Sequence, residues 1–173
     1  MVKKETRNTD LKINSITENN SPYSKAYLRY ALGLLFVVTL FNYTDRFVLS
    51  ILIDPIQKDT GLSDSQMGLL TGIAFAFVYA TLSVPIGRCA DRFNRVRIVA
   101  IAIMVWSGFT ALFGMTAGYI QMIGARIGVA AGEAGGVNPI YSIVGDYYPA
   151  ERRGMALAVI ALGGSVGTMF GFA

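Results

Sequence analysis

Hydrophobic residues gather in five long runs along the chain, separated by short polar loops. Each run reaches the roughly 20 apolar residues that an α-helix needs to cross about 30 Å of hydrocarbon. The pattern therefore predicts an all-α, polytopic transmembrane bundle over residues 26–173. The expected helices cover residues 27–53, 65–87, 96–115, 119–143 and 154–173.

The two ends of the chain differ from this pattern. Residues 1–25 are polar, rich in Asn, Ser, Thr and Lys, and lack the apolar core of a signal peptide. We expect a disordered cytoplasmic tail there. The last residues, "TMFGFA", are apolar and are followed by no charged or aromatic anchor. We therefore expect this helical bundle to be truncated at its C-terminus and to belong to a longer protein.

Composition supports a membrane location. Of the 173 residues, 53% are hydrophobic and only 15% are charged, and the mean hydropathy is +0.48. Soluble domains carry about 25% charged residues. The net charge of +4 comes from basic residues that flank the apolar runs, so it does not indicate a nucleic-acid partner.

The inventory of reactive side chains is short. The chain has one cysteine, Cys89, and no histidine. An intrachain disulfide and a Cys/His metal site are therefore excluded, and we expect no metal and no cofactor. Proton chemistry near neutral pH would have to use carboxylates in altered surroundings. No nucleophile motif or phosphate-binding loop indicates an enzyme.

The distribution of Lys and Arg predicts the orientation. Basic residues are concentrated in the tail, in the loop after the second apolar run and in the loop after the fourth. The loop after the first run holds one lysine among three aspartates, and the loop after the third holds no charge. By the positive-inside rule, the N-terminus and the second and fourth loops are cytoplasmic.

Small residues recur at every fourth position in three of the predicted helices. Such spacing makes a ridge along one helix face and lets two helices approach closely in lipid. Packing is the simplest reading, although smooth faces could also slide during a conformational cycle. The ridges consist of Gly68, Gly72, Ala76 and Ala80; of Gly124, Gly128, Gly132 and Gly136; and of Gly163, Gly167 and Gly171.

Four charged residues interrupt the predicted helices. Asp45 and Arg46 lie in the first helix, within "FNYTDRFVLSILI", and Arg126 and Glu133 lie in the fourth. At about 1.5 Å of rise per residue, Asp45 and Arg126 reach similar depths of roughly 10–12 Å below the outer surface. Glu133 is seven residues further along and shares the face of Arg126. We expect the four charges to form one cluster, with Asn42 on the same polar stripe as Asp45 and Arg46.

Three interpretations of these charges remain open. Each charge costs roughly 2.5–3.5 kcal/mol near mid-membrane, so all three place it beside a partner or water. The cluster could be a static salt bridge that fixes the packing of the first and fourth helices. Asp45 and Arg46 could instead snorkel to the outer interface. The third interpretation is a gated, protonatable site.

The two basic loops suggest a charge network on the cytoplasmic side. The first reads "GRCADRFNRVR", from Gly87 to Arg97, and the second reads "GDYYPAERRG". Arginines in the first loop can hold it to the anionic inner leaflet. Asp146 and Glu151 in the second loop offer partners for those arginines.

The ordered motifs resemble the major facilitator superfamily. "GRCADRFNRVR" is similar to the signature G-x-x-x-D-R-x-G-R-R between helices 2 and 3, although Asn94 replaces the glycine and Val96 the last arginine. "RIGVAAGEAG" resembles the helix-4 signature, and the pattern D-x-x-P-x-x-x-R-G after helix 4 is present from Asp146 to Gly154. "NYTDRFVLS" and "GEAGGVNPIYSIVGDYYP" look most like the Spinster-like branch, which is associated with lysolipid and sphingolipid export.

The resemblance implies a fold and roles for individual residues. It implies two six-helix bundles, of which this chain would hold five helices of the N-terminal one. Asp45, Arg46, Arg126 and Glu133 would serve proton coupling and gating. The substrate cavity would include Asn42, Tyr43 and Asn138. The conformational signature loops would use Gly87, Asp91, Arg92, Arg95, Asp146 and Arg153.

We therefore predict a secondary transporter that works by alternating access, is coupled to protons and carries a lipid-like or amphipathic substrate. Its partners would be that substrate, the proton, membrane lipids and the second bundle. The alternatives are an organic-anion/proton symporter of the same superfamily and a membrane scaffold that does not transport. The expected location is the plasma or inner membrane.

Overall fold

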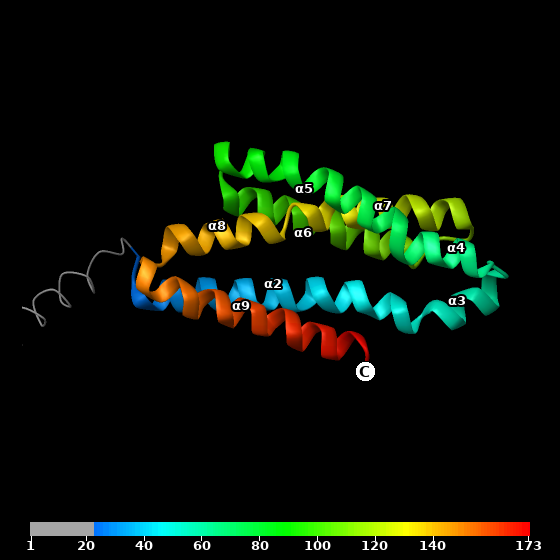
Figure 1. Cartoon of the computed structure of the whole chain (residues 1–173), viewed down its shortest axis with the longest axis horizontal. Helices are drawn as coiled ribbons and strands as arrows, with labels where there is room; N and C mark the ends of the chain where they lie inside the picture. The colour runs from blue at the N-terminus through cyan, green and yellow to red at the C-terminus, as the bar shows by residue number, and fades with distance from the viewer. Residues whose placement is uncertain (1–22) are drawn as a thin grey trace, which may run out of the picture.

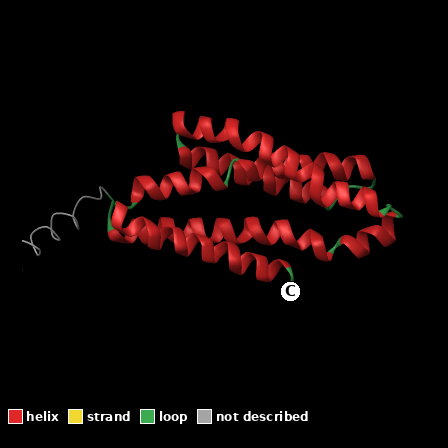
Figure 2. Cartoon of the chain, viewed as in Figure 1, coloured by secondary structure: helices red, strands yellow, loops and turns green. Residues whose placement is uncertain are grey.

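The computed structural model describes residues 23–173, and the predicted tail lies almost entirely outside this range. Helices joined by short loops make up the described chain (Figure 2). In Figure 1, α2 and α9 run side by side along the long axis, across from the layer formed by α5 to α8. The elements are α2 (Lys25–Ile51), α3 (Ile53–Thr60), α4 (Asp64–Gly68), a π-helical turn η1 (Leu69–Ile73), α5 (Ala74–Arg92), α6 (Arg95–Phe113), α7 (Tyr119–Ala134), α8 (Val137–Tyr147) and α9 (Ala150–Gly171).

Polar side chains at the loops begin the crossing helices. The Ser24 hydroxyl accepts a hydrogen bond from the Tyr27 amide at 3.2 Å, and Ser63 and Gln66 form a capping box at the start of α4. Asn94 caps α6, because its side-chain oxygen accepts from the Arg97 amide at 3.1 Å. A glycine could not make this last bond, which gives the departure from the superfamily signature at residue 94 a structural role.

Four continuous helical stretches in the described chain are long and apolar enough to cross a membrane: Lys25–Ile51, Asp64–Arg92, Arg95–Phe113 and Ala150–Gly171. Many of their large apolar side chains point outward, among them Phe77 at 71% exposure and Met104 at 65%. Exposed apolar surface of this extent suits contact with lipid rather than water.

The fourth apolar run, expected as one helix over residues 119–143, is divided into α7 and α8. The break falls at Gly135 and Gly136, where the amides of both residues bond back to carbonyls three residues earlier. Pro139 follows in the first turn of α8 and has no amide hydrogen to continue the helical pattern. Glu133 therefore lies at the end of α7, directly before the break.

Two of the three small-residue ridges make close helix contacts. Gly163, Gly167 and Gly171 of α9 lie against the backbone of α2, and a Cβ on Gly163 would lie 2.7 Å from the Phe36 carbonyl oxygen. Gly128 and Gly132 of α7 lie against Phe109 and Trp106 of α6. Gly68 and Gly72 have open space around them, so the ridge on the second helix is not a packing surface among the described residues.

Candidate functional site

The strongest polar contact inside the helical layers joins α2 to α7. Arg46 donates from Nε and Nη2 to Glu133 Oε2, at 3.2 and 2.6 Å. The Glu133 side chain is fully buried, and that of Arg46 keeps 27% of its exposure. This ion pair connects the first and fourth predicted helices, as expected. It argues against snorkelling of Arg46 to the outer interface.

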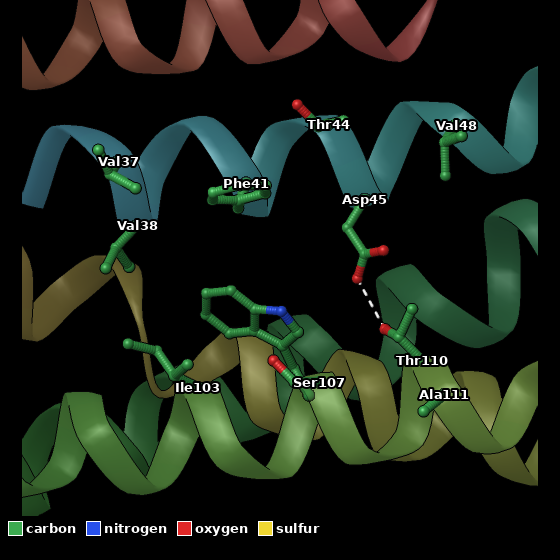
Figure 3. A pocket seen from close by; sticks show the side chains of 11 residues that line it. Val37, Val38, Phe41, Thr44, Asp45, Val48, Ile103, Ser107, Thr110 and Ala111 are labelled. Atoms are coloured by element: carbon green, nitrogen blue, oxygen red, sulfur yellow. Dashed lines mark hydrogen bonds between the residues drawn. The ribbon is translucent and has the colours of Figure 1, made fainter.

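Asp45 points in a different direction from its neighbour. Adjacent residues on an α-helix are separated by about 100°, so the side chains of Asp45 and Arg46 leave α2 in different directions. Asp45 Oδ2 accepts a hydrogen bond from the Thr110 hydroxyl of α6 at 2.7 Å. Figure 3 shows this bond across the cavity between α2 and α6. Asp45 is thus also held within the protein.

Arg126 is buried, at 5% exposure, but it forms no ion pair within residues 23–173. Its guanidinium carbon lies 4.5 Å from the centroid of the Phe75 ring. It is close enough to Asp45 and Glu133 to interact with both charges, and it lines a cavity of about 180 Å³ together with Asp45. The four predicted residues therefore share one region, although Glu133 pairs with Arg46 and not with Arg126.

Aromatic rings surround the two guanidinium groups. The Arg46 guanidinium carbon lies 5.7, 5.0 and 4.9 Å from the ring centroids of Tyr43, Phe75 and Tyr79. Rings at such distances stabilise a desolvated cation. Phe75 and Tyr79 follow directly after η1, and π-helical turns of this kind change which residues face a neighbouring helix. Neither was predicted, although their i, i+4 spacing was visible in the sequence.

Several buried polar atoms in this region have no hydrogen-bond partner among the described residues. They are Glu133 Oε1, Arg126 Nε and both terminal atoms of the Asn42 amide. Asn42 is only 3% exposed. Buried polar atoms are normally satisfied, so these atoms mark a place suited to water, an ion or a polar substrate group.

The other predicted cavity residues divide between two places. Tyr43 lies beside Arg46 and also lines a cavity of about 200 Å³ between α2, α8 and α9. Asn138 lies beyond the break, where its amide donates to the Ser83 carbonyl of α5 at 3.4 Å. A Cβ on Gly87 would lie 3.9 Å from the same amide. The structure thus groups Asn138 with the C-terminal half of α5.

The two basic loops, between α5 and α6 and between α8 and α9, form part of the expected network. Arg95 at the start of α6 forms an ion pair with Asp146 near the end of α8, as predicted. Arg153 donates to the carbonyl oxygens of Tyr148 and Gly145, at 2.9 and 2.8 Å. Asp91 and Arg92 are exposed and make no hydrogen bond or ion pair within residues 23–173.

Comparison with known proteins gives a consistent picture. Residues 35–173 match the model of the Major Facilitator Superfamily. The structure superposes on the crystal structure of a bacterial homologue of the human lysosomal transporter Spinster, in an inward-facing and unoccupied conformation. The TM-score is 0.83 at 40% sequence identity, over 86% of this chain and 31% of the other.

Relatives with assigned names are transporters, which agrees with the expectation that the chain is not an enzyme. An MFS-type efflux pump of Mycolicibacterium smegmatis is 37% identical over 76% of this chain and 31% of its own length. A probable galactarate/D-glucarate transporter of Bacillus subtilis is also 37% identical, over 72% of this chain and 29% of its own. The chain thus spans about a third of the length of these relatives.

Proposed function

Because the chain belongs to the Major Facilitator Superfamily, we propose that it forms part of a secondary transporter that works by alternating access and is driven by protons. It is a multi-pass integral membrane protein with a Spinster-like fold. In the proposed mechanism this bundle rocks against a second one around a site near the middle of the membrane.

The observation that carries the proposal is a cluster of two carboxylates and two guanidinium groups, in which Glu133 and Arg126 are buried and Asp45 and Arg46 are half-buried. Its formal charges cancel when Asp45 and Glu133 are ionised. Protonation of one or both carboxylates would leave Arg46 or Arg126 with uncompensated positive charge. An isolated guanidinium away from water favours an anionic partner. Proton uptake and the binding of an organic anion would therefore support each other at this site.

Glu133 is the proposed centre of the exchange. Arg46 donates two hydrogen bonds to Glu133 and is the ionic partner of its charged form. When rocking draws α2 away from α7, the buried carboxyl group loses this partner and is more stable with a proton. A substrate anion can then take the place of Glu133 beside Arg46. Asp45 accepts a hydrogen bond from Thr110 and lines the cavity of about 180 Å³ together with Arg126.

The test is uptake into proteoliposomes by the protein that the complete reading frame encodes. Wild type should accumulate an anion from a panel containing galactarate and D-glucarate when the pH gradient supplies protons. Asp45→Asn and Glu133→Gln should each lower this accumulation at least tenfold. Asp59→Asn, in the exposed end of α3, is the matched control. Unchanged accumulation in both cluster variants would contradict the proposal.

A lipid-like substrate is the second candidate. It is supported by the likeness to the Spinster homologue and by the cavity of about 490 Å³ between α2 and α6, which is lined mostly by apolar side chains. A lysophospholipid in the same panel separates the two candidates. Competition by the lysophospholipid, with none by the sugar acids, would favour the lipid; the reverse would favour the organic anion.

We also propose that the N-terminus faces the cytoplasm, in the plasma or inner membrane. In that orientation the loop with Asp91 and Arg92 is free to dock on the second bundle in one conformational state. The exposed Cys89 tests the orientation. A membrane-impermeant maleimide should label it in inside-out vesicles and not in intact cells; labelling in intact cells would reverse the topology.

A different experiment distinguishes the transporter from a membrane scaffold whose charges are static. Replacing Arg46 and Glu133 together by leucine removes both charges of the pair. If the pair only holds the helices together, this double variant should fold and keep every measured activity of the wild type. We expect this double variant to fold and to lose proton-driven uptake.

A further inference from the structure

Among the described residues, one hydrogen bond crosses the large cavity between α2 and α6. α2 packs mainly on α9, and α6 packs mainly on α7, so the two helices face each other across open space. The cavity holds about 490 Å³. Within residues 23–173, the hydrogen bond between the Thr110 hydroxyl and Asp45 Oδ2 joins the two helices across it (Figure 3).

Thr110 behaves differently from other threonines in the membrane helices. Thr39, Thr71 and Thr168 donate their hydroxyl hydrogen to the carbonyl oxygen four residues earlier. Thr44 lies at hydrogen-bond distance from such a carbonyl and from the Gly167 carbonyl of α9. This local bond is the common way in which a hydroxyl is satisfied in an apolar helix. The Thr110 hydroxyl donates to a carboxylate on another helix instead. Its orientation therefore serves Asp45 and not the backbone of α6.

Three charged groups surround Asp45 and its hydrogen bond to Thr110. Arg126 of α7 lines the smaller cavity that Asp45 also lines. Arg46 is the next residue along α2, and Glu133 of α7 adds negative charge to the same region. Without another donor, the Asp45 carboxylate would gain most by closing onto the unpaired Arg126. A tight buried ion pair of that kind would be slow to open.

We propose that Thr110 is a positioning residue for Asp45, holding its carboxylate on the α6 side of the cavity and apart from Arg126. This inference rests on the proposed proton-driven function of the cluster. In this role Thr110 acts through Asp45. It keeps Asp45 and Arg126 available as separate groups, one for a proton and one for an anion.

The experiment uses three variants of the protein from the complete reading frame. Thr110→Val keeps the shape of the side chain and removes the donor, whereas Thr110→Ser keeps the donor. Thr81→Val is the control, because Thr81 is exposed on α5, does not line this cavity, and its hydroxyl bonds to no other described residue. Infrared difference spectra against Asp45→Asn identify the carboxylate stretch of Asp45 without any substrate. Anion uptake is measured in proteoliposomes in parallel.

Thr110→Val should shift the Asp45 carboxylate band and lower proton-driven uptake about tenfold, the effect of roughly one hydrogen bond to a charged group. Thr110→Ser and Thr81→Val should keep the wild-type band and at least half of the uptake. In an Asp45→Asn background, Thr110→Val should cause no further loss.

Two results would overturn the inference. One is an unshifted Asp45 band in Thr110→Val. The other is a Thr110→Ser variant as impaired as Thr110→Val, because the methyl group would then matter and not the hydroxyl. Wild-type uptake in Asp45→Asn would instead contradict the proposed function, and a shifted band in Thr110→Val would still support the positioning of Asp45.

Discussion

Helix α2 uses two opposite kinds of interface. Toward α9 it presents backbone: Gly163 and Gly167 lie against the carbonyl oxygens of Phe36 and Leu40, and Thr44 donates to the Gly167 carbonyl at 3.0 Å. Toward α7 it presents the charged side chain of Arg46, which reaches Glu133. Close backbone packing depends only on shape. The charged contact depends on shape and on whether Glu133 carries a proton.

This difference indicates which interface can open. The glycine contacts between α2 and α9 contain no group that changes charge between acidic and neutral pH, so we expect these two helices to move as one body. The α2–α7 contact loses most of its attraction when the carboxylate is neutralised. The proton-sensitive contact is thus built on the same helix as a rigid one, and movement at one interface need not disturb the other.

The largest expected effect comes from breaking the charged interface on one side only. Glu133→Gln leaves the Arg46 guanidinium without its ionic partner in a buried site, at a cost of about 3–5 kcal/mol. The thermal midpoint in detergent, followed by circular dichroism, should fall clearly. Arg46→Leu combined with Glu133→Leu should recover most of that loss, since no unpaired member of the pair remains. A single variant as stable as wild type would contradict the account.

A smaller effect is expected from the interface between α2 and α9. Gly167→Ala places a methyl group against the backbone of Leu40, where a flexible side chain cannot give way. Overpacking of this kind costs about 1–3 kcal/mol. Gly124→Ala is the matched control, because nothing lies within 4 Å of a Cβ there. The loss in Gly167→Ala should be the same at acidic and neutral pH, and a pH-dependent loss would argue against a purely steric interface.

The smallest effect should come from the ion pair between Arg95 and Asp146. Arg95 and Asp146 keep 28% and 52% of their side-chain exposure. Exposed pairs contribute about 0–1 kcal/mol and are screened by salt. Arg95→Gln should therefore shift the thermal midpoint only slightly, and less in high salt than in low salt. A loss as large as that of Glu133→Gln would remove the distinction between the buried and the exposed pair.

The sequence predicted the membrane-crossing helices and the location of the charge cluster better than it predicted which charged residues pair with each other. Counting residues from the helix ends places Asp45, Arg126 and Glu133 at neighbouring depths, because the rise per residue is constant. It does not fix how each helix is rotated toward its neighbours. The pairing of Glu133 with Arg46, and of Asp45 with Thr110, depends on that rotation.

The pattern of apolar residues also did not predict two local irregularities of the helices, the break between α7 and α8 and the π-helical turn η1. The run over residues 119–143 is uniformly apolar enough to read as one helix, but Gly135, Gly136 and Pro139 weaken its backbone at one place. The π-helical turn Leu69–Ile73 has no comparable marker in composition. Phe75 and Tyr79 were missed for this reason, since their direction follows from that turn.

The central claim is that protons move with the substrate through this cluster, and counting protons tests it most directly. Proteoliposomes would enclose a pH-sensitive dye while the protein takes up the anion that wild type accumulates from the panel. The account predicts acidification of the lumen in step with wild-type uptake, and none in a variant combining Asp45→Asn with Glu133→Gln. Wild-type uptake without acidification, or wild-type acidification in that double variant, would contradict it.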